Sequence, residues 1–277
     1  MVELCILNKT EQHSIIRNIQ MTVATKRIGS LSRGLQIIEI LADGRDGLPL
    51  IKIARKAGVS KSSTHRLLQT LVQEGFVTQD GDSSRYRLSL KLLSLSSNLI
   101  AGLGLDQLVR PLLEELSQAT KQTIHLSLWD SSVAVYAQKI HPPSSIRLYS
   151  QVGKRVPMYC TGLGKAILAF LPEERAKEVV AVEELKRHTP NTITKSTALL
   201  EHLSLIRSCG YALDEEEHEE GIRCLAAPLL DRQNNVLGSV SITTLAFRVD
   251  KETLLSWWPL LRDCAQQIAT VMEHYSP

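Results

Sequence analysis

Residues 50–69, LIKIARKAGVSKSSTHRLLQ, constrain the fold of this chain more than any other segment. Apolar positions recur at helical spacing on both sides of Gly58, and glycine readily adopts the positive φ that a tight turn requires. Ser60 is a favoured N-cap residue, and Ala54 is small enough to let two helices pack closely. The pattern predicts two short helices around a tight turn, the helix-turn-helix arrangement.

A helix is expected before this motif and a β-hairpin after it. Ser30 is a candidate N-cap for the first helix, an amphipathic helix whose recurring apolar positions are Leu31, Leu35, Ile38 and Leu41 or Ala42. Residues 76–78 and 86–88 alternate in polarity around a polar turn, as the two strands of a wing would. We therefore predict a winged helix-turn-helix domain over residues 28–90, preceded by a flexible arm over residues 1–27.

Basic charge is concentrated in this same part of the chain. Residues 26–91 hold twelve Lys and Arg against six Asp and Glu, a balance of +6, whereas residues 92–277 hold eighteen against twenty-one, a balance of −3. A basic module gains affinity for nucleic acid because neutralised phosphates release their counterions. A charged face that only meets solvent would show the same charge balance. The DNA-binding candidates are Ser60, Lys61, Ser62, Ser63, Thr64, His65, Arg66, Arg85 and Arg87.

The rest of the chain mixes helices and strands. Residues 91–120 show helical periodicity with glycines near the middle, and we interpret them as a helical linker. Residues 121–277 are expected to form an α+β domain. Its predicted strands are 123–129, 133–140, 146–149, 224–230 and 238–244, and its predicted helices are 161–170, 173–180, 197–209 and 251–274.

Composition and spacing argue against several other classes of protein. No apolar stretch is long enough to span a membrane, the first 25 residues lack a signal-peptide core, and five scattered cysteines suggest neither disulfides nor zinc, so a cytoplasmic location is expected. Lys165 is followed by Ala166, which does not fit a nucleotide-phosphate loop. Cys160 has no recognisable catalytic base among the histidines, and the mixed group Asp214, His218 and Cys224 has no established metal spacing. We expect no enzymatic activity, cofactor or metal.

Three separated segments resemble the IclR family of bacterial regulators. They are SLSRGLQIIEIL with IARKAGVSKSSTHRLLQTLVQEGFV, then PMYCTGLGKAILAFLP, then DEEEHEEGIRCLAAPLLD. Within that family, TIHLSLWD, RLYSQVGKRVPMY and HEEGIRC are most similar to the branch of repressors of 2-keto-3-deoxygluconate and pectin-degradation genes. The likeness covers nearly everything after residue 30.

The resemblance implies a GAF-like effector domain controlled by a small organic acid, binding to double-stranded promoter DNA, and a homodimer or dimer of dimers. Recruitment of RNA polymerase is a further possibility, because the position of the operator decides between repression and activation. A helix start at Gly162 and Leu163 offers backbone N–H groups to a carboxylate. The effector candidates are Arg147, Met158, Gly162, Leu163, Asp214, Cys224, Ser241 and Thr243.

Two alternatives remain at this stage. The acidic run from Asp214 to Glu220 could be a solvated loop, and Arg147 could be a surface residue instead of a partner for the acid. The helix-turn-helix could also serve only for assembly, in a small-molecule-binding or catalytic protein. Loss of DNA binding on Arg66→Ala, with assembly and ligand binding intact, would count against this second alternative.

Overall fold

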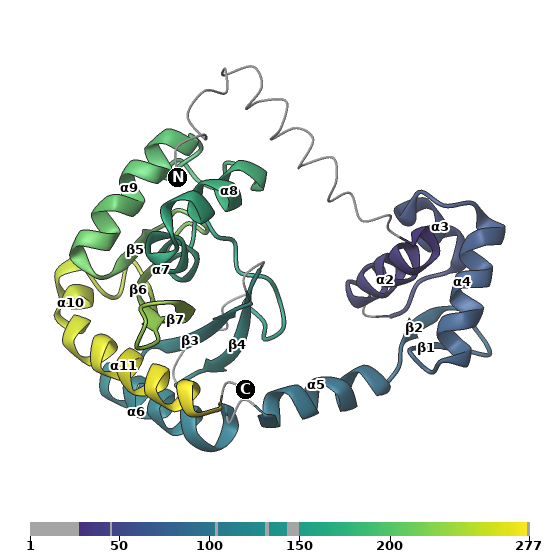
Figure 1. Cartoon of the computed structure of the whole chain (residues 1–277), viewed down its shortest axis with the longest axis horizontal. Coiled ribbons are helices and arrows are strands. Elements are labelled where there is room, and N and C mark those ends of the chain that lie inside the picture. The colour runs from purple at the N-terminus through teal and green to yellow at the C-terminus, as the bar shows by residue number, and fades with distance from the viewer. Residues whose placement is uncertain (1–27, 45, 103–104, 131–132, 143–149, 276–277) are drawn as a thin grey trace, which may run out of the picture. The chain divides into compact units, whose positions relative to one another are not determined.

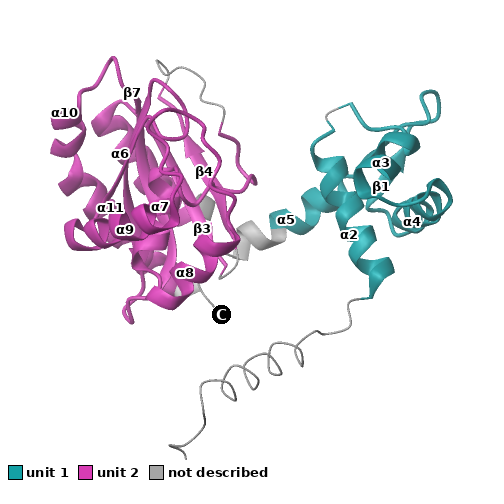
Figure 2. Cartoon of the chain, turned by 90° about the horizontal axis from the view of Figure 1, so that it is seen from above, with its two compact units in different colours: residues 1–98 teal, residues 99–277 magenta. Residues whose placement is uncertain are grey.

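The computed structural model describes residues 28–44, 46–102, 105–130, 133–142 and 150–275. The chain divides into two compact units, residues 1–98 and 99–277 (Figure 2). The arm expected over residues 1–27, the strand expected over residues 146–149 and Arg147 lie outside the described residues. Within the described ranges, no helix is long and apolar enough to cross a membrane.

The first unit is a winged helix-turn-helix, as the sequence predicts. Its helices are α2 (Gly29–Ala42), α3 (Leu50–Ala57) and α4 (Lys61–Gln73), followed by the antiparallel strands β1 (Val77–Gln79) and β2 (Tyr86–Leu88) (Figure 1). The elements share one apolar core, whose buried residues are Ile37, Leu41, Leu48, Ile53, Leu68, Val77 and Tyr86.

The apolar positions from which α2 is predicted do not all face the core. The helix buries Gly34, Ile37 and Leu41, while Leu31 and Leu35 are 60% and 55% exposed. Apolar residues occupy two sides of α2, so periodicity alone cannot tell which side meets the core. Nor does Ser30 cap the helix, because α2 begins one residue earlier, at Gly29.

Three helical segments follow in the region expected as a linker. These are α5 (Lys91–Gly102), a π-helical turn (Leu105–Val109) and α6 (Arg110–Thr120). In α6, Leu113 and Leu116 are buried in the apolar core of the second unit. The end of the expected linker is therefore packed inside the second unit, whereas α5 crosses the boundary between the two units.

The second unit is built on a five-stranded antiparallel sheet in the order β4-β3-β7-β6-β5. The strands are β3 (Thr123–Trp129), β4 (Ala134–Ile140), β5 (Ala212–Glu215), β6 (Ile222–Leu230) and β7 (Val236–Leu245). Its later helices are α7 (Gly162–Phe170), α8 (Glu173–Val182), α9 (Ser196–Cys209), α10 (Lys251–Ser256) and α11 (Trp258–Tyr275). The α+β prediction is confirmed, although β5 was not expected and the helix predicted over residues 251–274 is two helices.

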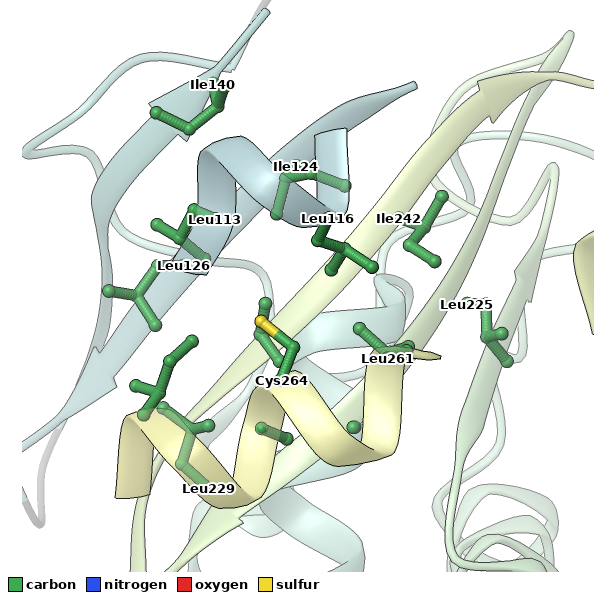
Figure 3. Close-up of a cluster of buried hydrophobic side chains, with 14 of the residues drawn as sticks. Leu113, Leu116, Ile124, Leu126, Ile140, Leu225, Leu229, Ile242, Leu261 and Cys264 are labelled. Atoms are coloured by element: carbon green, nitrogen blue, oxygen red, sulfur yellow. The ribbon is translucent and has the colours of Figure 1, made fainter. Parts of the chain in front are cut away.

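The two faces of the sheet differ in chemistry. Alternate positions on β3, β6 and β7, such as Ile124, Leu225 and Ile242, face α6 and α11 and form an apolar core with Leu113 and Leu261 (Figure 3). The intervening positions point to the other side, which α7 covers. That second face carries polar residues, and all of these are buried: His125, Ser127, Ser239, Ser241 and Thr243.

Candidate functional site

The turn between α3 and α4 has the geometry expected of a helix-turn-helix. Gly58 adopts φ 63° and ψ 30°, and its N–H donates to the carbonyls of Ala54 and Arg55 at the end of α3. Ser60 then caps α4, since its Oγ accepts the Ser63 N–H at 3.3 Å. These two devices set the direction in which α4 leaves the turn.

The start of α4 presents a mixed basic and hydroxyl surface. Lys61, Ser62, His65 and Arg66 are exposed, and Ser63 is half-buried. Thr64 is different, because it is fully buried and its Oγ1 donates to the Ser60 carbonyl at 3.0 Å. The structure therefore leaves Thr64 no surface with which to touch DNA, and the hydroxyl of Ser60 is already engaged in capping.

The wing carries two exposed arginines on one side of β2. Tyr86 between them is buried, as the alternation predicts. Arg85 donates to the Gly47 carbonyl at 3.2 Å, and Arg87 forms an ion pair with Asp80 at 2.7 Å. A phosphate would therefore compete with Asp80 for Arg87.

A cavity of about 220 Å³ lies between the polar face of the sheet and the start of α7. Its sheet side is formed by His125 and Tyr136 together with Asp214, Cys224, Ser241 and Thr243. The strand register explains this grouping, since Asp214 pairs with Cys224 and Cys224 with Thr243 in one row across the sheet. The remaining lining residues are Ser150, Gln151, Lys154, Arg155, Pro157, Thr161, Gly162, Leu163, His218, Glu219 and Ile222.

The start of α7 supplies backbone donors to this cavity. Thr161 caps the helix by accepting the Gly164 N–H at 3.0 Å, whereas the N–H groups of Gly162 and Leu163 have no acceptor among the residues that the structure describes. The first N–H groups of a helix have no partner inside it, and the helix dipole favours an anion there. Lys154 and Arg155 add positive charge to the lining.

Burial shifts the titratable groups at the sheet side of the cavity, including Asp214 and His125, toward their neutral forms. It raises the pKa of Asp214 to about 7, even though the carboxylate accepts the Glu217 N–H at 2.9 Å. It also lowers the pKa of His125 to about 3, and the nearby Lys139 and His141 act in the same direction. The ring nitrogens of His125 bond the hydroxyls of Thr243 at 3.0 Å and Ser150 at 2.7 Å. The sheet side of the cavity is thus polar, with a neutral His125 and an Asp214 carboxyl that titrates close to neutral pH.

A buried ion pair between Lys165 and Glu217 holds the acidic run in place. The Lys165 ammonium on α7 is fully buried and bonds the Glu217 carboxylate, whose own exposure is 8%. Thr192 Oγ1 donates to the Glu217 carbonyl at 2.6 Å. Burial raises the pKa of Glu217 despite the adjacent ammonium. Asp214 and Glu217 therefore belong to the interior and not to a solvated loop.

Comparison with known proteins identifies the family. Residues 30–81 match the IclR helix-turn-helix domain, and residues 98–270 match the bacterial transcriptional regulator IclR C-terminal domain. The chain belongs to the IclR family. The HTH-type transcriptional regulator KdgR of Escherichia coli K12 is 35% identical over 248 residues, which are 90% of this chain and 94% of that protein.

Two further IclR relatives agree with this assignment. The transcriptional repressor IclR of Escherichia coli K12 is 30% identical over 88% of this chain and 90% of its own. The crystal structure of the Thermotoga maritima IclR superimposes with a TM-score of 0.66 at 31% identity, over 89% of this chain and 99% of that chain. The chain is accordingly a helix-turn-helix transcription regulator, and its relatives are regulators and not enzymes.

The structure brings together six of the eight residues expected to bind an effector. Gly162, Leu163, Asp214, Cys224, Ser241 and Thr243 all line the cavity. Met158 is not among the cavity-lining residues, and its side chain is buried in the apolar core around α7. His125 and Tyr136 were not expected to line it. His125 pairs with Ser241 and Tyr136 pairs with Ser127, so both lie on the polar face of the sheet.

Cys160 does not have the properties of a nucleophile in this IclR domain. Its side chain is fully buried, and burial raises the pKa of its thiol to about 12, with Asp214 and Glu217 adding to the effect. A reactive cysteine needs the opposite shift. Instead, its sulfur lies beside His188 and His218, and the potential ligand atoms of these three residues all lie within 4.8 Å of one another.

Proposed function

We propose that this protein is a repressor that binds promoter DNA through α4 and the wing, and that a small hydroxylated acid in the cavity changes its affinity for that DNA. One observation supports the proposal that the cavity binds such an acid. The cavity places the N–H groups of Gly162 and Leu163 beside buried hydroxyl groups, including Ser241 and Thr243. A carboxylate suits the helix start, and the hydroxyls of a sugar acid suit the sheet side. Resemblance to the 2-keto-3-deoxygluconate branch supports this class of ligand.

The DNA contacts can be tested with two exposed cations of α4. Purified protein is titrated on its own upstream intergenic DNA and on scrambled DNA at several fixed salt concentrations. Arg66→Ala should weaken binding to the specific site about 5- to 150-fold, as loss of a base contact worth about 1–3 kcal/mol would. Lys61→Ala should weaken both DNAs alike and reduce the salt slope by about 1. Equal loss on both DNAs for Arg66→Ala would refute its role in reading bases.

The ligand part is tested on the same DNA with 2-keto-3-deoxygluconate and related sugar acids. Asp214→Ala and Ser241→Ala should bind DNA like wild type yet respond weakly to the acid, because both residues line the cavity. Ser204→Ala on the exposed side of α9 is the control and should respond like wild type. A full response in both cavity variants would refute the site.

Coupling between the two functions is proposed to run through the helical segment at residues 91–120, in a homodimer or dimer of dimers that binds a palindrome in the cytoplasm. Exposed leucines on α2 and α5, including Leu35 and Leu93, support association between copies of the chain. Sedimentation velocity measures the assembly directly. A monomer that still binds specific DNA would refute the oligomer, and an intact oligomer without selective DNA binding would favour an assembly module.

A further inference from the structure

We propose that Cys160, His188 and His218 form a binding site for a transition-metal ion of the Zn²⁺ type. The three residues come from separate loops, before α7, between α8 and α9, and between β5 and β6. Their potential ligand atoms all lie within 4.8 Å of one another. Ligand atoms in a tetrahedral zinc site are separated by roughly 3.5 Å, given bonds of about 2.0–2.3 Å. A movement of about 1 Å at the side-chain ends would therefore close the site.

Hydrogen bonds hold the two histidine loops against each other without any metal. The Thr189 hydroxyl donates to the Glu216 carbonyl at 2.6 Å, and the Thr192 hydroxyl donates to the Glu217 carbonyl at 2.6 Å. Both threonines are buried, and each lies within four residues of His188. The carbonyls that they bond belong to the two residues before His218. The imidazoles are consequently positioned by backbone contacts, and their ring centroids lie 5.1 Å apart.

A neighbouring tyrosine selects the tautomer of His188 that a metal needs. The Tyr159 hydroxyl donates its single proton to the Lys186 carbonyl at 2.9 Å. Its oxygen can therefore only accept from His188 Nε2, which lies 3.0 Å away. The proton is placed on Nε2, which leaves the lone pair of Nδ1 available to a metal ion. Second-shell acceptors of this kind are typical partners of metal-bound histidines.

The donor set favours a particular class of metal. One thiolate and two imidazoles suit Zn²⁺ and Co²⁺ better than Mg²⁺ or Ca²⁺, which prefer oxygen ligands. Three protein ligands leave one position of a tetrahedron open. His218 also lines the cavity, so the site lies beside the cavity wall. The site does not depend on the proposed regulatory function.

The test is a titration of chelator-treated full-length protein with Co²⁺. One ion per chain should bind with a thiolate-to-cobalt charge-transfer band in the near ultraviolet and intense visible absorption from tetrahedral Co²⁺. Cys160→Ser should abolish the charge-transfer band. His188→Asn and His218→Asn should each weaken Co²⁺ binding at least about 10-fold, and Tyr159→Phe should weaken it about 10- to 100-fold.

Matched controls separate this site from adventitious binding. Cys209→Ser removes an exposed thiol, and His202→Gln removes a histidine outside the cluster, so both should bind Co²⁺ like wild type. Absence of the thiolate band in wild type, or its persistence in Cys160→Ser, would overturn the proposal. X-ray absorption of Zn²⁺-loaded wild type needs no variant. One sulfur and two imidazoles in the first shell would support the site, and a shell of oxygens alone would overturn it.

Discussion

His125 ties the stability of the second unit to pH. Its pKa is about 3 in the folded chain against an ordinary value of 6.5, chiefly because burial disfavours the imidazolium. Below pH 6.5 the unfolded chain binds a proton that the folded chain does not. The stability contributed by neutral His125 is therefore complete above pH 6.5 and is lost as the pH falls. At 1.36 kcal/mol per pH unit, the loss reaches about 2 kcal/mol at pH 5 and about 5 kcal/mol near pH 3.

Replacement of His125 by Asn removes this titration while keeping one donor and one acceptor. Unfolding in urea is followed by tryptophan fluorescence between pH 8 and pH 5, and all three tryptophans, Trp129, Trp257 and Trp258, lie in the second unit. The free energy of unfolding of wild type should fall about 2 kcal/mol more than that of His125→Asn over this range. The exposed His65 on α4 of the first unit offers a matched variant, His65→Asn, which should follow wild type. Parallel pH curves for wild type and His125→Asn would refute the reasoning.

Two further substitutions in α7 test its packing, with the same fluorescence measurement. A Cβ at Gly164 would lie 2.4 Å from the Pro157 carbonyl oxygen and 2.5 Å from the Met158 Cα. Gly164→Ala should therefore cost about 1–3 kcal/mol of unfolding free energy, and an unchanged value would contradict this close approach. Lys165→Met leaves the buried Glu217 carboxylate without its cation and should cost about 3–5 kcal/mol. The double variant with Glu217→Gln should recover much of the loss, and an additive loss would show that the pair is not coupled.

Local signals in the sequence were sufficient for most of the elements. Gly58 and Ser60 mark the ends of α3 and α4, and the strands β3 and β6 follow from their apolar content. The sequence also contained a sign of the break between α10 and α11, although the helical periodicity runs on through it. Pro259 lacks an N–H group for the helix ladder, and α11 begins at Trp258 directly before it. The strand β5 has only four residues, too few to show an alternation.

The functional residues that sequence reasoning missed depend on long-range pairing. Alternation places His125 on the opposite face from Ile124 and Leu126, but only the register with Ser241 on β7 brings it to the cavity. Lys165 has no local signal for burial, since its partner Glu217 lies far along the chain. The same holds for Cys160 and the two histidines beside it. Thr64 shows the converse error, because hydroxyl chemistry indicated DNA while helix geometry buries the side chain.

The polar face of the sheet also predicts how an effector acts on stability. Asp214 and His125 are both buried and both shifted toward neutrality, so this face stabilises the fold less than an apolar face would. A ligand that bonds these groups binds the folded chain alone, and it should raise the free energy of unfolding by about 2.7 kcal/mol at 100 times its Kd. Tryptophan fluorescence in urea can therefore rank sugar acids without any DNA, with Ser241→Ala as the variant that loses the gain. An acid that alters DNA binding without stabilising the second unit would place the effector outside this cavity.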